Sequence, residues 1–314
     1  MSKHLIVGID GSPESEAAMG WALEEAIRRD LEVELLYALA VPVVSDAYGM
    51  VMTRPDIDEL TDYSRKLLDA ALISAQGLAP QLTITARLAS GPPAAVLIEA
   101  SKHAEALVVG TRGLGAISGR LLGSVSIRLA GKSVCPVFVV PPEWRSHPLP
   151  DAPVLVWVDG SEHSDAALHL ALDEARCRGV GLTVLSAYHV PWLARPVEPA
   201  LIAEFEQSEH WLAEKTIGES LARVKGHNYA DVPIEQVTVR GLPAETVVEA
   251  SRKAALTVVG SRGRRSFSRA ILGSVSRSLM QDAVRPVAVV HKATRKHGQS
   301  GDQPRPNPPQ NDSR

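Results

Sequence analysis

Short, wholly apolar segments alternate along the chain with longer segments in which apolar residues recur at helical spacing. LIVGI at 5–9, LVVG at 107–110 and VFVV at 137–140 are apolar on successive residues, which is typical of strands buried on both faces. After the first strand, Ser12 and Pro13 are suited to cap and begin a helix. Strands separated by helices join through parallel crossovers. The pattern therefore predicts an open, doubly wound parallel α/β sheet with helices on both faces.

This pattern occurs twice in the chain. The corresponding segments are 4–26 with 152–175, 87–110 with 238–260, and 135–140 with 285–290. A length of 314 residues also suits two domains of ordinary size. We therefore predict two tandem α/β domains of five strands each, a first copy at 1–141 and a second copy at 153–291.

The remaining segments lack the strand and helix pattern. Residues 142–152 are rich in proline and are predicted to be a linker between the copies. Residues 292–314 contain almost nothing to bury, so we predict a disordered tail there.

Composition and charge exclude several classes of protein. The net charge is −3 at a pI of about 6.4, which gives no general electrostatic reason to bind nucleic acid or an anionic membrane. No apolar run is long enough to span a membrane, and the first residues lack the pattern of a secretory signal. The two cysteines, Cys135 and Cys177, have neither disulfide-framework nor zinc-ligand spacing. We therefore expect a cytoplasmic protein with neither nucleic acid nor membrane as its partner.

One glycine pattern recurs in both copies while the residues between the glycines change. VVGTRGLGAISGRLLGSVS at 108–126 returns as VVGSRGRRSFSRAILGSVS at 258–276. These glycines follow the fourth strand, and in such sheets ligands bind beyond the carboxyl ends of the strands. Gly123 and Ser124 then open a helix, whose first N–H groups lack partners and whose dipole favours an anion. The pattern predicts a phosphate-binding loop in each copy, to which Arg112 can add charge.

Two alternatives to this interpretation have to be weighed. Duplication alone could have kept the glycines as turns and a helix cap. The better known nucleotide motifs do not apply, because the chain has no G-x-x-x-x-G-K-[ST] and the glycines do not follow the first strand.

Together, the motifs resemble those of the universal stress protein family. They are G-x2-G-x9-G-S, Asp-Gly-Ser after the first strand, G-x-P-A before the third helix, and C/R-P-V in the last strand. The likeness covers nearly all of residues 3–291 and is to the tandem, ATP-binding type. It implies a strand order of 3-2-1-4-5 in each copy. It also implies that ATP binds at the carboxyl edge of the sheet with Mg²⁺ or another divalent metal, whose protein ligands stay unassigned.

The resemblance also implies which residues contact the nucleotide. In the first copy they are Gly8, Asp10, Ala38 and Val109 near adenine, Gly110 at the ribose, and Gly113, Gly123, Ser124 and Val125 at the phosphates. In the second copy the corresponding residues are Asp159, Ala187, Val259, Gly260, Gly263, Gly273, Ser274 and Val275, with Arg262 at the position of Arg112.

Several of these positions allow more than one interpretation. Trp157 stands where the first copy has Gly8, and its indole could stack on the base or fill the second pocket. Asp10 and Asp159 could be ligands, or they could form the turn after each first strand. Arg262 belongs to an arginine cluster at 262–269 that could clamp phosphates or an RNA backbone, or remain solvated loop charge.

The sequence favours a nucleotide-responsive binding module over an enzyme. Phosphoryl transfer needs a positioned base or water-orienting residue besides a phosphate cradle, and the motifs supply no such residue. The alternative is a slow ATPase or nucleotide-dependent transferase on the same fold. The resemblance further implies that the last strands of the two copies pair within the chain as a pseudo-dimer, and that two chains form a homodimer. Stress response is the expected role, with no protein partner identified.

Overall fold

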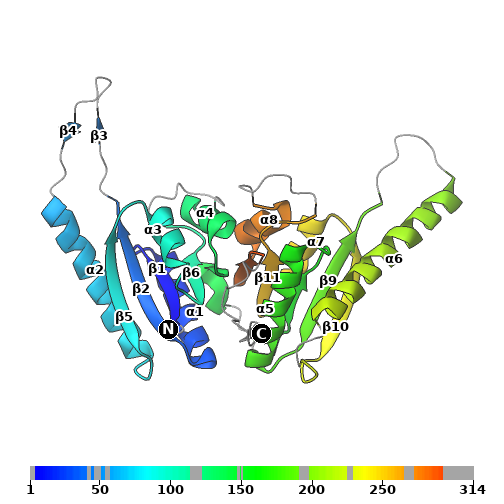
Figure 1. Cartoon of the computed structure of the whole chain (residues 1–314), viewed down its shortest axis with the longest axis horizontal. Helices are drawn as coiled ribbons and strands as arrows, with labels where there is room; N and C mark the ends of the chain where they lie inside the picture. The colour runs from blue at the N-terminus through cyan, green and yellow to red at the C-terminus, as the bar shows by residue number, and fades with distance from the viewer. Residues whose placement is uncertain are drawn as a thin grey trace, which may run out of the picture.

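The computed structural model describes residues 4–40, 44–45, 51–53, 57–113, 122–146, 149, 151–190, 198–224, 229–264 and 272–292. The tail predicted at 292–314 lies, beyond Lys292, outside the described residues. A single ten-stranded sheet runs through the molecule (Figure 1). Among the described helices, none has both the length and the apolar character of a membrane span.

The first copy contains the predicted alternation of strands and helices. Its elements are β1 (His4–Ile9), α1 (Pro13–Arg29), β2 (Glu32–Leu39), α2 (Ile57–Leu78), β5 (Ile84–Ser90), α3 (Pro93–Ala100), β6 (Ala106–Gly110), α4 (Ser124–Lys132) and β7 (Val137–Val140). Between β2 and α2, the short strands β3 (Val44–Ser45) and β4 (Val51–Thr53) pair antiparallel. The sequence pattern does not predict these two strands.

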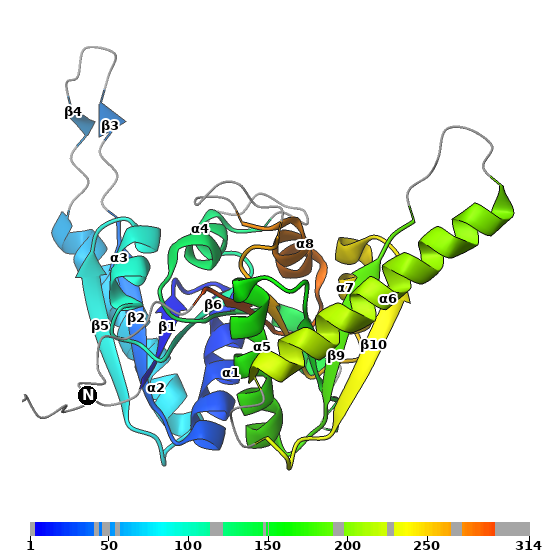
Figure 2. The same ribbon diagram turned by 45° about the vertical axis from the view of Figure 1, so that its right-hand side comes forward.

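The second copy repeats the arrangement, and its described residues hold no counterpart of that hairpin. Its elements are β8 (Val154–Trp157), α5 (Glu162–Arg178), β9 (Leu182–Tyr188), α6 (Pro199–Val224), β10 (Ile234–Arg240), α7 (Pro243–Ser251), β11 (Leu256–Gly260), α8 (Ser274–Asp282) and β12 (Val287–Val290). Figure 2 shows α6 lying along β9 and β10 and extending past them. The stretch between the copies holds a 3-10 helix, η1 (Pro142–Ser146), which packs on α1 through the hydrogen bond from Trp144 Nε1 to the Ala17 carbonyl, 3.1 Å long.

The strand order confirms the fold prediction. The sheet reads β10-β9-β8-β11-β12-β7-β6-β1-β2-β5, which is 3-2-1-4-5 in each copy. Pairs within a copy are parallel, whereas β7 and β12 pair antiparallel, with Phe138 opposite Ala288. The last strands therefore join the copies into one continuous sheet, as expected for an intrachain pseudo-dimer.

Buried side chains form a core on each face of this sheet. One core packs α1, α2, α5 and α6 against it and contains Trp21, Leu68 and Ile217; the other packs α3, α4, α7 and α8 and contains Leu97 and Leu279. Strands with both faces covered need apolar residues at successive positions, which explains their continuous apolar runs. The helices lie on both faces, as predicted.

The helix starts follow the local signals in the sequence. Ser12 is the N-cap of α1 and accepts a hydrogen bond from the Ser15 N–H, while Pro13 is the first helical residue. Ser161 caps α5 in the same way through the Ser164 N–H. Each cap fixes where the first helix leaves the carboxyl end of its strand, beside the candidate site.

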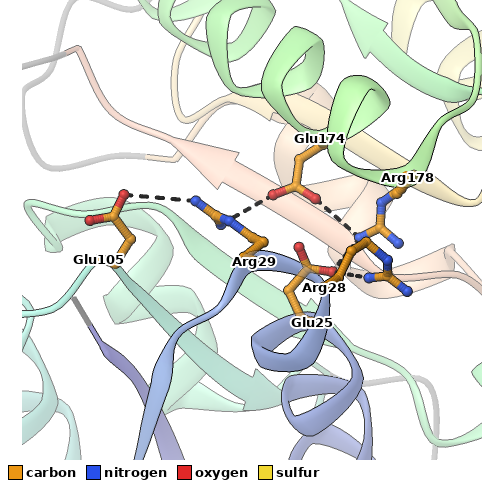
Figure 3. A network of polar contacts seen from close by, with 6 residues as sticks. All are labelled: Glu25, Arg28, Arg29, Glu105, Glu174 and Arg178. Carbon is orange, nitrogen blue, oxygen red and sulfur yellow. Dashed lines mark hydrogen bonds and ion pairs between the residues drawn. The ribbon is translucent and has the colours of Figure 1, made fainter.

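Where α1 and α5 meet, the two copies share a buried ionic network (Figure 3). We call it the interdomain network; it consists of Glu25, Arg28, Arg29, Glu105, Glu174 and Arg178. Arg178 Nη2 lies 2.6 Å from Glu25 Oε2 and 3.1 Å from Glu174 Oε2, and Arg29 Nη1 lies 3.2 Å from Glu174 Oε1. The side chains of Glu25 and Glu174 are 0% and 1% exposed. The two acids and their arginines thus bridge the copies in a dry environment.

Candidate functional site

Two loops meet above the sheet between its first and fourth strands, the point at which the strand order reverses. In the first copy these are the β1–α1 turn with Asp10 and the loop after β6, and in the second the β8–α5 turn with Asp159 and the loop after β11. Such switch points are where open α/β sheets bind ligands. The fold therefore brings the predicted aspartates and glycine loops together in both copies.

Asp10 forms the turn after β1 and also faces the glycine loop. Its Oδ1 accepts hydrogen bonds from the Ser12 N–H at 3.0 Å and the Ser12 hydroxyl at 2.6 Å. A Cβ atom added to Gly113 would lie 2.1 Å from Asp10 Oδ2, so any side chain there would collide with the carboxylate. Both interpretations of Asp10 thus find support, since one oxygen holds the turn and the other faces the loop.

Asp159 has the same arrangement in the second copy. Its Oδ1 accepts from the Ser161 N–H at 3.0 Å, and its Oδ2 accepts from the Arg264 N–H at 3.0 Å. A Cβ atom at Gly263 would lie 2.4 Å from Asp159 Oδ2. The second glycine of each loop therefore leaves the room that the carboxylate occupies.

The first glycine of each loop has a different structural reason. A Cβ atom on Gly110 would lie 2.8 Å from the backbone of Glu14, and one on Gly260 would lie 2.8 Å from the backbone of His163. Backbone atoms at that distance cannot move aside cheaply, so α1 and α5 can pack this closely only against glycine. These two glycines are required by helix packing, independently of any ligand.

The third glycine opens the helix that follows the loop. Gly123 is the N-cap of α4, and its N–H donates to the Thr111 carbonyl at 2.9 Å. Ser124, the first helical residue, is exposed and does not cap α4; no side chain does. The first N–H groups of the helix consequently lack intrahelical partners and face the edge where the loops meet. Gly273 and Ser274 repeat this arrangement at α8.

Sequence reasoning missed the serine two residues further on. The buried Ser126 hydroxyl donates to the Gly110 carbonyl at 2.8 Å, and Ser276 donates to the Gly260 carbonyl at 2.9 Å. These bonds tie the helix start to the end of the fourth strand and so fix the loop between them. The sequence did contain a signal for these serines, because the pattern G-S-x-S occurs at the corresponding place in both copies.

A pocket of about 540 Å³ opens at this edge of the second copy. The predicted residues that line it are Asp159, Ala187, Gly260, Arg262, Gly263, Gly273, Ser274 and Val275. Val259 instead belongs to the core and is fully buried. The opposite wall comes from α6, through Glu209, Leu212 and Thr216, and was not predicted. The volume of the pocket is within the range of small-ligand and cofactor sites.

Trp157 lines this pocket without closing it. The indole is 8% exposed and packs in the core cluster that includes Leu185, Val247 and Val259. In the first copy, a Cβ atom on Gly8 would already lie 3.1 Å from Val109 and 3.4 Å from Leu97. Leu97 corresponds to the smaller Val247, which leaves room for the indole in the second copy. The tryptophan is therefore a wall residue that replaces core volume.

The remaining first-copy residues lie at the same edge. Ala38 is in the last part of β2, Val109 is buried in β6 next to Gly110, and Val125 is the second residue of α4. Arg112 follows β6 and forms an ion pair with Glu14, Nε to Oε1 3.5 Å. No group of three or more His, Cys, Asp or Glu side chains suited to a metal ion occurs among the described residues.

The family model of the universal stress protein family matches residues 1–141 and 152–291. The chain belongs to the universal stress protein family. It is 37% identical over 303 residues to a universal stress protein of Mycobacterium tuberculosis, covering 92% of this chain and 96% of that one. It is 35% identical over 292 residues to one of Mycolicibacterium smegmatis, covering 91% and 96%.

Solved structures show the same fold as this tandem universal stress protein. A universal stress protein from Archaeoglobus fulgidus superposes with a TM-score of 0.65 at 22% identity, covering 93% of this chain and 99% of that one. A putative universal stress protein from Pseudomonas aeruginosa gives 0.56 at 16% identity, covering 93% and 94%.

Proposed function

We propose that this universal stress protein binds ATP in each copy, with the phosphates at the start of α4 or α8, and acts as a nucleotide-responsive binding module. The observation that carries the proposal is the pocket of the second copy. Eight of the nine second-copy positions chosen from the glycine repeat and the family resemblance lie on the wall of one cavity of about 540 Å³. The N–H groups of the helix start, which have no intrahelical partners, suit an anion, and the neighbouring arginines add positive charge.

The residues also fit a divalent metal that arrives with the nucleotide. Bound Mg²⁺ would neutralise part of the phosphate charge. Asp10 Oδ2 faces Gly113, so the missing side chain leaves this carboxylate oxygen at the loop that would hold the phosphates. Asp10 would therefore be the protein ligand of the metal in the first copy and Asp159 in the second, and phosphate oxygens would be further ligands.

Substitution of Asp10 separates its turn-forming role from its ligand role. Asp10→Ala removes the acceptor for the Ser12 N–H and hydroxyl and should lower the free energy of unfolding by about 1–2 kcal/mol. Asp10→Asn keeps an acceptor and should stay within about 0.5 kcal/mol of wild type. If the carboxylate holds the metal, Asn should also reduce the gain in ATP affinity that Mg²⁺ provides, measured by calorimetry with and without Mg²⁺. If Mg²⁺ raises the ATP affinity of Asp10→Asn as much as that of wild type, Asp10 only forms the turn and does not hold the metal.

Introducing a negative charge at the helix starts tests the nucleotide sites themselves. Ser124→Glu and Ser274→Glu should each weaken ATP binding in their own copy by about tenfold or more, because the new carboxylate meets the phosphates. Both serines are exposed, and glutamate in a first helical turn favours the helix dipole, so the fold should be retained.

The matched controls are Ser124→Gln and Ser274→Gln, which change size without adding charge. Isothermal titration calorimetry of the full chain should give two ATP sites in wild type, of which one is weakened by about tenfold or more in each glutamate variant. Equal affinities for all five proteins would refute the placement of the phosphates.

Small molecules released from purified protein on denaturation, identified by mass spectrometry, should include ATP or ADP. Sustained ADP production by metal-loaded protein would instead favour the slow ATPase.

A further inference from the structure

The two copies differ in one charge beside the phosphate loop. Gly110 packs against the backbone of Glu14 in the first copy, and Gly260 packs against the backbone of His163 in the second. The same place in the fold thus holds a carboxylate in one copy and an imidazole in the other. Each faces the arginine of its own loop, Arg112 or Arg262.

In the first copy, the carboxylate offsets the arginine. Glu14 Oε1 lies 3.5 Å from Arg112 Nε, and the two side chains are 19% and 30% exposed. An arriving phosphate would have to compete with Glu14 for this guanidinium, and the carboxylate would repel the phosphate.

In the second copy, the imidazole does not offset the charge of the arginine. The Lys292 N–H donates to His163 Nδ1 at 2.9 Å, so the proton of the neutral ring is on Nε2. Burial lowers the pKa of His163, and the nearby Arg262 lowers it further, which keeps the ring neutral. The adjacent acid, Glu162, forms an ion pair with the Lys292 ammonium. Within the described part of the chain, Arg262 forms no ion pair.

Arg262 is also part of the pocket wall. It lines the cavity together with Gly263, Gly273 and Ser274, and so stands beside the start of α8. The cavity wall also includes Trp157, where the first copy has Gly8. The second pocket therefore offers more positive charge to phosphates and a different surface to a base.

We infer that the second pocket binds phosphate groups more strongly than the first, and takes a triphosphate group whether or not a nucleoside is attached. Glu14 and His163 are the residues that set this difference between the copies. The inference rests on the proposed function, because it assumes that both pockets receive phosphates. It predicts that the second site, and not the first, binds inorganic triphosphate well.

The test is calorimetric titration of the full chain with inorganic triphosphate and, separately, with ATP. Wild type should bind triphosphate strongly at a single site, which Ser274→Glu removes and Ser124→Glu leaves intact. His163→Glu should weaken triphosphate binding at that site by about tenfold, because it restores the carboxylate beside Arg262. Glu14→His should create a second triphosphate site in the first copy.

Matched controls separate charge from other effects of substitution. His163→Gln stays neutral and keeps an acceptor for the Lys292 N–H, so it should bind triphosphate as wild type does. Glu16→His makes the same charge change on an exposed position of α1 and should create no new site. Proper folding of each variant is checked by its thermal unfolding midpoint.

The outcomes distinguish this inference from the proposed function. If neither ATP nor triphosphate binds, the proposed function fails. If ATP binds at both sites but triphosphate binds equally at both, or better at the first, the proposed function stands and the inference is overturned. The inference is also overturned if His163→Glu leaves triphosphate binding unchanged while Ser274→Glu abolishes it.

Discussion

Replacing Arg178 by alanine should lower the free energy of unfolding by about 3–5 kcal/mol, because it removes one partner of a buried ion pair. Arg178 contacts both Glu25 and Glu174 at the α1–α5 contact and is itself only 10% exposed. Neither carboxylate can reach solvent when the guanidinium is lost, since both side chains are almost fully buried. The guanidinium also lies over the Trp21 ring, 5.9 Å from its centroid.

The measurement is equilibrium unfolding in denaturant at pH 7, compared with Arg252→Ala. Arg252 forms one exposed ion pair with Glu249, of the kind that contributes about 1 kcal/mol or less. A loss for Arg178→Ala no larger than the loss for Arg252→Ala would contradict the importance of the buried network. Because the network links the copies, we also expect the variant to unfold in two steps if the copies can separate.

Most of the fold could be predicted from the sequence because the signals are local or repeated. Successive apolar residues mark strands buried on both faces, and Ser12 with Pro13 marks the start of α1. The repeat then places Asp10 and Asp159 at equivalent positions, so a single interpretation of the loops serves both copies. The glycines follow the fourth strand of each copy, as the pattern indicates, although Gly110 and Gly260 are explained by helix packing before any ligand is considered.

The interdomain network could not be predicted in the same way. Glu25 and Arg29 lie one helical turn apart, a spacing typical of solvent-exposed pairs. The burial of Glu25 depends on the pairing of β7 with β12, which brings α5 of the other copy against α1. Repetition was the available signal, because Glu174 and Arg178 occupy the corresponding positions of α5.

The pocket wall shows a second limit of sequence reasoning. Leu212 and Thr216 come from α6, which follows an irregular segment and carries no motif that points to a site. The fit of Trp157 depends on a long-range exchange of volume, with Val247 in place of Leu97. The sequence alone does not show that Val247 and Leu97 lie near position 157 and its counterpart Gly8.

The network should also make stability depend on pH through Glu174. Burial raises the pKa of its carboxyl to about 8, Glu25 raises it as well, and Arg178 and Arg29 oppose the shift. In the unfolded chain a glutamate has a pKa of about 4.3. Between these values the folded protein holds a proton that the unfolded chain releases. This contribution to stability is therefore complete below about pH 4.3 and is lost as the pH rises through about 8.

Glu174→Gln tests this directly, because the amide resembles the protonated carboxyl and does not titrate. From pH 6 to pH 9, wild type should lose a few kcal/mol more unfolding free energy than Glu174→Gln. Burial lowers the pKa of His291 to about 4, but this residue is present in both proteins, so its contribution to the pH dependence cancels in the comparison. The control Glu24→Gln alters an exposed acid of α1 and should follow wild type. Parallel curves for wild type and Glu174→Gln would mean that Arg29 and Arg178 keep the carboxylate charged, so that the buried acids act as fixed ion-pair partners at every pH tested.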